Sequence, residues 1–212
     1  MKKELIDGFR RCFEGYTRAY GILGELEEDD SGKMQGRNTV VKNAVTDELF
    51  ERHLDGTGNG LRLIPLKDNN KLRYAAIDLD KKQKTTPLKD TIEQIEDKID
   101  KLKLPLIPCQ SKSGDIHLYC FTKEDVEPKL LMARMNEWAS LLGYGSAEKF
   151  PKQTSRLSEE DTGSALNLPY FDYKNTTRFA INKKKRLSLA EFIEFVDVMR
   201  VSKEELKSFK LE

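Results

Sequence analysis

Apolar residues recur at helical spacing in several parts of the chain. Leu5, Phe9 and Phe13 lie four residues apart, which predicts a short N-terminal helix that Gly15 ends. The apolar positions of residues 88–102 repeat at steps of four and three, as is typical of an amphipathic helix, and Pro105 follows them. Further helices are expected over residues 46–55, over residues 128–142, and after Ser188, which forms a capping box with Glu191.

Short apolar runs between these helices predict strands, because each run is bounded by turn residues. Residues 19–45 are expected to form a hairpin around a turn at residues 29–32. Further strands are expected at residues 61–66, 72–80, 106–110, 115–121, 146–150 and 178–181. From residue 72 onwards the order is therefore β-α-β-β-α-β, the split arrangement of ferredoxin-like and RNA-recognition folds.

The first strand of such a unit is central, with the third strand on one side and the fourth on the other. Neighbouring side chains of a strand point to opposite faces of the sheet. We therefore expect Ile77 and Leu79 to face the two helices, and Asp78 and Asp80 to point together to the open face.

The same alternation brings further polar side chains to this open face. On the third strand we expect Asp115, His117 and Tyr119 there, and on the fourth strand Glu148 and Phe150. Carboxylates held close together repel one another, and a hard divalent cation such as Mg²⁺ or Mn²⁺ offsets their charge. The pattern is consistent with the paired ions that polymerases use to activate an attacking 3′-hydroxyl and to stabilise the leaving pyrophosphate.

Each of these residues also has a purely structural interpretation. An Asp-x-Asp pair before Lys81 and Lys82 is most often a solvated strand end, and an isolated strand histidine such as His117 is usually structural or exposed. We interpret His53, inside the predicted helix at residues 46–55, as a packing or surface residue without an assigned role. Tyr119 suits ordinary packing and stacking on a base about equally.

Composition narrows the class of protein. The 212 residues are enough to bury a core, and the charged residues, 34% of the chain, cancel to a net charge of +1. Any contact with nucleic acid must therefore come from local patches. Three cysteines without a CxxC spacing favour neither a disulfide framework nor a zinc site, and indicate a reducing setting. Because no run approaches the roughly 18 apolar residues of a membrane span, we expect an untargeted cytoplasmic protein.

Three segments resemble the sequence motifs of archaeo-eukaryotic primases. The strand AIDLD (76–80) resembles the first motif, and SKSGDIH (111–117) resembles the second, with its serine and histidine. FPKQ (150–153), with Glu148 before it and GSALNLPYF (163–171) after it, is similar to the third-motif region of primase-polymerases from CRISPR-associated loci and TOTE conflict systems. The order and spacing of the three motifs are more specific than Asp-x-Asp alone, and the resemblance extends from residue 13 to residue 193.

The resemblance implies a site for divalent metals and a nucleoside triphosphate. Asp78, Asp80 and Glu148 would hold the metals, although many relatives have aspartate where Glu148 stands, and His117 completes the catalytic set. The implied nucleotide-binding residues are Ser111, Lys112, Ser113, Gly114, His117 and Lys152. The candidates for DNA binding are Lys149, Gln153, Asn167, Arg178, Lys183 and Lys184.

We therefore expect an α+β protein with the archaeo-eukaryotic primase fold. An N-terminal αβ portion (1–70) would pack against the RNA-recognition-like catalytic unit (71–151), residues 152–212 would complete the cleft, and the active site would lie in that cleft. The implied activity is metal-dependent nucleotidyl transfer from dNTPs or NTPs on a single-stranded DNA template, which makes and extends primers. The resemblance also implies a prokaryotic or phage-like setting and partner regions of the CRISPR-adaptation or helicase type. Two alternatives remain open, a metal-dependent nuclease and a non-catalytic module that binds single strands.

Overall fold

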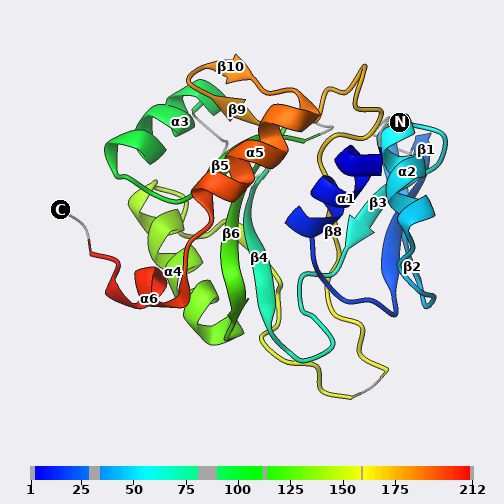
Figure 1. Ribbon diagram of the computed structural model, residues 1–212, viewed down its shortest axis with the longest axis horizontal. Coiled ribbons are helices and arrows are strands. Elements are labelled where there is room, and N and C mark those ends of the chain that lie inside the picture. Colours follow the sequence, from blue (N-terminus) through cyan, green and yellow to red (C-terminus); the bar gives the residue numbers. More distant parts are fainter. Residues whose placement is uncertain (1–2, 29–33, 81–89, 112–113, 159, 211–212) are drawn as a thin grey trace.

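The computed structural model describes residues 3–28, 34–80, 90–111, 114–158 and 160–210. These ranges contain two four-stranded antiparallel sheets with helices packed against them, so the chain is an α+β protein (Figure 1). No helix within these ranges combines the length and the apolar character that crossing a membrane requires.

The first sheet has the strand order β2-β1-β3-β8. Its strands are β1 (Tyr20–Glu28), β2 (Met34–Val41), β3 (Gly60–Leu63) and β8 (Leu166–Asn167). Two helices accompany it, α1 (Lys3–Cys12) and α2 (Asp47–Asp55). The α2 helix ends at Gly56, whose φ of 70° is the left-handed conformation that glycine adopts without strain. The predicted hairpin and both helices are confirmed.

The second sheet has the strand order β5-β6-β4-β7. Its strands are β4 (Leu72–Leu79), β5 (Ile107–Gln110), β6 (Ile116–Val126) and β7 (Glu148–Phe150). As predicted, β4 lies between β6 and β7, and helices α3 (Ile92–Lys101) and α4 (Pro128–Leu141) cover one face. Ile77 and Leu79 are buried on that face together with the apolar residues of both helices.

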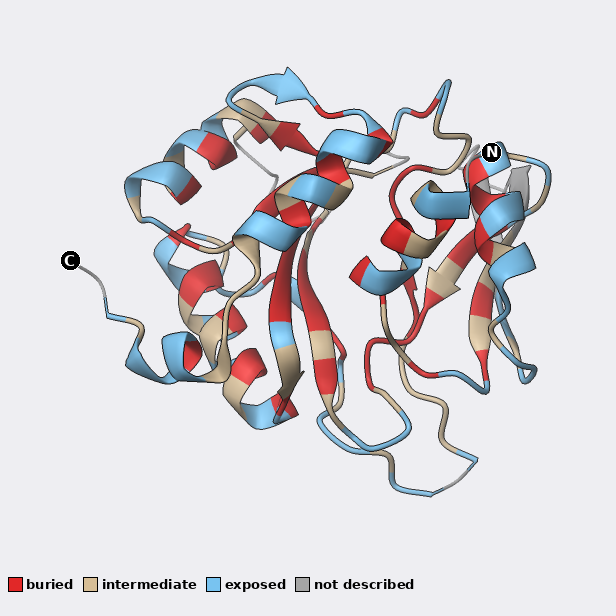
Figure 2. Ribbon diagram, in the orientation of Figure 1, coloured by how far each residue is buried: buried red, intermediate tan, exposed pale blue. Residues whose placement is uncertain are grey.

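The opposite face of the second sheet is covered along much of its length. Phe13, just after α1, and Phe192 of α5 (Leu189–Met199) pack against the aromatic residues of β6, Tyr119 and Phe121. Figure 2 shows buried residues running along β4 and β6 beneath these helices. The expectation that Tyr119 lies on an open face is therefore wrong, because its ring is fully buried in the core.

The C-terminal residues join the two sheets. The hairpin of β9 (Ile181–Asn182) and β10 (Lys185–Arg186) lies next to β5, where Ala180 bridges Cys109. The α5 helix packs on α1, and α6 (Lys203–Ser208) packs on α4. Arg200 donates hydrogen bonds to the carbonyl of Thr122 in β6 and to that of Arg11 in α1.

Several element boundaries differ from the prediction. The strand expected at 61–66 ends at Leu63 and pairs with β1, and β6 continues to Val126 instead of ending at Phe121. The strand expected at 178–181 begins at Ile181, and the short elements β8, β10 and α6 were not predicted. The turn at 29–32, the lysines at 81 and 82, and the first residues of the helix expected at 88–102 fall partly or wholly outside the described residues.

Candidate active site

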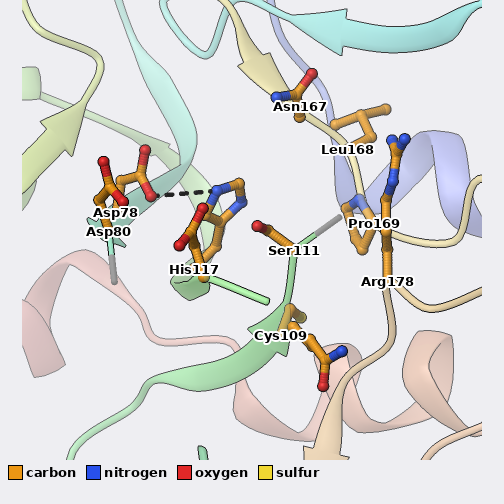
Figure 3. A pocket seen from close by; sticks show the side chains of 11 residues that line it. Asp78, Asp80, Cys109, Ser111, His117, Asn167, Leu168, Pro169 and Arg178 are labelled. Atoms are coloured by element: carbon orange, nitrogen blue, oxygen red, sulfur yellow. Dashed lines mark ion pairs between the residues drawn. The ribbon is translucent and has the colours of Figure 1, made fainter. Parts of the chain in front are cut away.

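Asp78 and Asp80 lie side by side at the end of β4 (Figure 3). The pairing of the strands sets His117 of β6 on one side of Asp78 and Glu148 of β7 on the other. The His117 Nε2 atom lies 3.4 Å from Asp78 Oδ1, and the side chains of Asp78 and His117 are 26% and 9% exposed. Alternation along β4 and β6 therefore brings Asp78 and His117 together, as the sequence predicts.

Asp78, Asp80 and His117 line a small cavity of about 130 Å³ between the two sheets. Figure 3 shows Asp78, Asp80 and His117 on one side of it, and Asn167 and Arg178 on the other. The complete lining consists of Asp78, Asp80, Cys109, Gln110, Ser111, Asp115, His117, Asn167, Leu168, Pro169 and Arg178. The cavity thus has an acidic wall from the second sheet and a second wall from the segment that follows β8.

A short chain of hydrogen bonds orients His117. The buried Tyr119 hydroxyl donates to the carbonyl of Asn167 at 3.0 Å, and His117 Nδ1 lies 3.2 Å from the same hydroxyl oxygen. Burial raises the pKa of Tyr119 well above its ordinary value, so the phenol remains a donor. The phenol oxygen therefore accepts from Nδ1, and Nε2 is the ring atom that faces Asp78 and the cavity.

Arg178 forms part of the second wall. Its guanidinium lies over the ring of Phe171, with the central carbon 5.0 Å from the ring centroid. Burial lowers the pKa of Arg178 from its ordinary value. Among the described residues, neither Arg178 Nη1 nor Asn167 Oδ1 has a hydrogen-bond partner, although both atoms are buried. The second wall therefore contains one buried donor and one buried acceptor that lack a hydrogen-bond partner within the described residues.

Glu148 is placed differently from the two aspartates. Its carboxylate is exposed and pairs with Lys152 at 3.0 Å. It lines a separate hollow with Met132, Asn136, Lys149, Pro151, Lys152 and Thr154. No cluster of three or more His, Cys, Asp or Glu side chains within the described ranges is arranged to hold a metal ion. The backbone register brings Glu148 next to Asp78, but its carboxylate is engaged elsewhere.

Comparison with known proteins decides the family. The family model described as "TOTE conflict system, Archaeo-Eukaryotic Primase domain" matches residues 14–209. The chain belongs to this family. Two solved structures are similar to the primase domain: the catalytic domain of primase Repb′ in complex with initiator DNA, and the AEP domain of the cyanophage S-2L primase-polymerase.

The first of these structures is 12% identical, with a TM-score of 0.40 and 92% of each chain covered. The second is 10% identical, with a TM-score of 0.48, covering 92% of this chain and 98% of that one. No curated protein matches the chain. The resemblance of the three motifs to archaeo-eukaryotic primases is thus confirmed by the family match, whereas the link to CRISPR-associated loci stays a prediction.

The predicted triphosphate residues of the primase domain are only partly assembled around the cavity. Ser111 lines it, and Gly114 closes the turn between β5 and β6 with a φ of 79°. Lys112 and Ser113 lie outside the described residues. Lys152 is paired with Glu148, and it lines the separate hollow rather than the cavity.

The residues predicted to bind DNA are spread over three places. Asn167 and Arg178 line the cavity itself, together with Asp78 and Asp80. Lys149 donates to the carbonyl of Gly145 beside the hollow of Glu148, and Gln153 donates to Asp161. Lys183 and Lys184 form the turn of the β9–β10 hairpin, where Lys184 pairs with Asp97 of α3 at 3.1 Å.

Sequence reasoning missed several residues of the cavity as functional candidates. Gln110 precedes the turn between β5 and β6, a position that the second motif could have indicated. Asp115, on the other side of this turn, was expected on the same face as the aspartates but was given no role. Leu168 and Pro169 arrive from the other sheet through the pairing of β8 with β3. That pairing is non-local and involves a strand of two residues, so periodicity gave no signal for it.

Proposed function

We propose that this primase domain catalyses template-dependent nucleotidyl transfer from dNTPs or NTPs, and so makes and extends primers on single-stranded DNA. The observation that carries the proposal is the pair Asp78 and Asp80, which lies beside His117 in a cavity of a chain that belongs to the primase family. In the reaction a 3′-hydroxyl attacks the α-phosphate, a new phosphodiester bond forms, and the bond to pyrophosphate breaks.

The residues of the cavity fit a divalent metal. Asp78 and Asp80 supply hard oxygen donors on one face of one strand, and the proximity of two carboxylates is costly without a cation. Mg²⁺ or Mn²⁺, when bound, supplies charge compensation for the triphosphate and activation of the 3′-hydroxyl. We assign Asp78 and Asp80 as ligands, with Glu148 as the third once its carboxylate leaves Lys152.

The remaining residues bind and orient the substrate in this proposal. His117 presents Nε2 to the cavity, and Ser111 lines the same wall. Because Nδ1 already donates to Tyr119, His117 donates from Nε2 to a triphosphate oxygen as an imidazolium, which carries an N–H on both ring nitrogens. Lys112, Ser113 and Gly114 belong to the same turn and are assigned the same partner. Lys152 joins them when Glu148 releases it, because an ammonium freed from a carboxylate is available to a phosphate.

The template is assigned to the surface outside the cavity. The Repb′ structure contains initiator DNA, and the hollow lined by Lys149 and Lys152 is open to solvent and next to β7. Lys183 at the hairpin turn is exposed, and Gln153 follows the motif that contains Lys152. With a net charge of only +1, such local groups must provide the backbone contacts.

A strand-synthesis assay tests the proposal. The protein is incubated with primed and unprimed single-stranded DNA, dNTPs and Mn²⁺, and the products are resolved by length. We expect incorporation by the natural sequence, and a loss of at least about 100-fold in a variant with Asp78→Ala and Asp80→Ala, the size typical of removing a transition-state electrostatic contact. A matched variant with Glu51→Ala and Asp55→Ala removes two exposed carboxylates from α2 and should retain the rate.

The same assay separates the alternatives. Cleavage of the template without synthesis would indicate a nuclease. Binding of DNA without any reaction would indicate a non-catalytic module, although the aromatic residues Tyr119 and Phe121, which such a module would offer, are buried. Equal synthesis by both double variants would refute the assignment of the two aspartates.

A further inference from the structure

His53 is fully buried in α2 and uses both ring nitrogens. Its Nδ1 atom accepts a hydrogen bond from the backbone N–H of Leu61 at 3.0 Å. The other nitrogen, Nε2, therefore carries the proton and donates to the carbonyl of Pro169 at 2.8 Å. One imidazole thus joins α2 to β3 and to the segment that follows β8.

The peptide bond between Pro169 and Tyr170 receives a second bond. The carbonyl of Pro169 accepts from His53, and the N–H of Tyr170 donates to the carbonyl of Arg178 at 2.7 Å. Tyr170 has a φ of 62°, a left-handed conformation that is uncommon for a bulky residue. Such a conformation persists where neighbouring groups fix the backbone, and here His53 and Arg178 hold the same peptide from its two ends.

Further contacts connect His53 with the side chain of Arg178. The imidazole packs edge-on against Phe171, with ring centroids 5.6 Å apart, and Phe171 lies under the guanidinium. The backbone carbonyl of His53 also accepts the N–H of Asp172 at 3.1 Å. His53 therefore contacts the segment 169–172 at three residues, Pro169, Phe171 and Asp172.

The segment that His53 holds is the second wall of the cavity. Pro169 lines the cavity directly, and so do Asn167 before it and Arg178, which is bonded to the same peptide. His53 accepts the N–H of Leu61, and the carbonyl of Leu61 accepts the N–H of Leu168. His53 itself does not line the cavity.

We propose that His53 is a positioning residue of the nucleotide site, which fixes the Pro169–Tyr170 peptide and thereby sets Asn167 and Arg178 opposite Asp78 and His117. The inference rests on the proposed function, because it assigns the second wall to the bound nucleotide. An apolar side chain would fill the same space, but it would leave the Leu61 N–H and the Pro169 carbonyl without their buried partner.

Two substitutions separate positioning from packing. Glutamine can place an amide donor near the position of Nε2, whereas asparagine can place an oxygen acceptor near the position of Nδ1. We expect His53→Gln to keep the bond to Pro169 and to hold KM for dNTP within about threefold of the natural value. We expect His53→Asn to lose that bond and to raise KM about tenfold, the equivalent of one lost bond, with the Kd for primed template unchanged.

A double-mutant cycle of His53→Asn and Arg178→Ala tests whether His53 affects KM through Arg178. If His53 acts through Arg178, His53→Asn should change KM by less than about twofold in an Arg178→Ala background. If KM of the double variant instead changes by the product of the two single-variant factors, the inference is overturned. So would equal KM values for the two His53 variants, or a parallel loss of affinity for primed template.

A measurement on the natural sequence covers the case in which a variant does not fold. The NMR signals of the His53 ring and of the Tyr170 amide should shift when the protein is saturated with a dNTP, although neither group lines the cavity. Signals that stay in place while the dNTP binds would overturn the inference. Absence of nucleotide incorporation by the natural sequence, with these shifts present, would count against the proposed function alone.

Discussion

Two buried polar atoms distinguish the second wall of the cavity at the scale of single residues. Arg178 Nη1 and Asn167 Oδ1 have no partner among the described residues, and a buried group in that state costs about 1–3 kcal/mol. Folded proteins rarely keep such atoms without a reason. Because both residues line the cavity that also contains Asp78, their unsatisfied bonds are consistent with a wall that binds a polar ligand.

The pH dependence of stability provides a test at the same scale. Burial lowers the pKa of His53 from its ordinary value of 6.5 to about 4; the bond to Pro169 opposes this shift, and the charge of Arg178 adds to it. A histidine with a lowered pKa stabilises the fold in its neutral form. Its contribution is therefore complete above about pH 6.5 and is lost as the pH falls towards 4.

We expect the free energy of unfolding to decrease by up to about 3 kcal/mol across this interval because of His53. Chemical denaturation at a series of pH values measures the decrease, and His53→Gln provides the comparison, since glutamine does not titrate. The difference in unfolding free energy between the two proteins should shrink as the pH is lowered. A difference that stays constant from pH 7 to pH 4 would contradict the burial of a neutral imidazole.

At the scale of elements, α5 is the helix that closes the face of the second sheet. Phe192 and Val196 are fully buried on it, and Phe192 contacts the rings of Phe13 and Phe121. The helix begins with a capping box, in which the Ser188 hydroxyl accepts from the N–H of Glu191 and the Glu191 carboxylate accepts from the N–H of Ser188. This box was predicted from the sequence.

Ser188→Ala should lower the free energy of unfolding by about 1 kcal/mol, the usual cost of removing an N-cap hydroxyl. Denaturant titration followed by circular dichroism measures this loss. Ser202→Ala, which removes the same kind of cap from α6, is the matched control and should cost less, because α6 buries only Leu206 and can open without global unfolding. A larger cost for Ser202→Ala would show that α6 closes the fold instead.

Local patterns explain why half of the cavity could be predicted. The alternation of side chains in β4 and β6 gave the faces of Asp78 and His117, and the helix stripes gave the face that α3 and α4 cover. Alternation cannot say what packs on the remaining face, so the burial of Tyr119 beneath Phe13 and Phe192 was not foreseen.

The second wall could not be predicted because it depends on contacts between distant parts of the chain. Asn167 pairs with Arg62, and Pro169 accepts from His53, more than 100 residues earlier in the sequence. No periodicity reports such a contact. His53 itself looked like an ordinary helix residue, and only its two backbone partners distinguish it from one.

At the scale of the whole molecule, the cavity exists because two sheets meet. Its acidic wall comes from β4, its histidine from β6, and its second wall from the segment after β8, which belongs to the first sheet. The C-terminal residues reach both parts, through α5 on α1 and through Arg200 on β6. These contacts connect the two parts of the chain that form the cavity.

The position of bound metal tests the central claim most directly. Crystals of the natural sequence with Mn²⁺ and a non-hydrolysable dNTP allow Mn²⁺ to be located by its anomalous scattering. We predict density for Mn²⁺ between the carboxylates of Asp78 and Asp80, with the triphosphate beside His117 and the carboxylate of Glu148 separated from Lys152. Mn²⁺ and the triphosphate bound away from Asp78 and Asp80 would contradict the account.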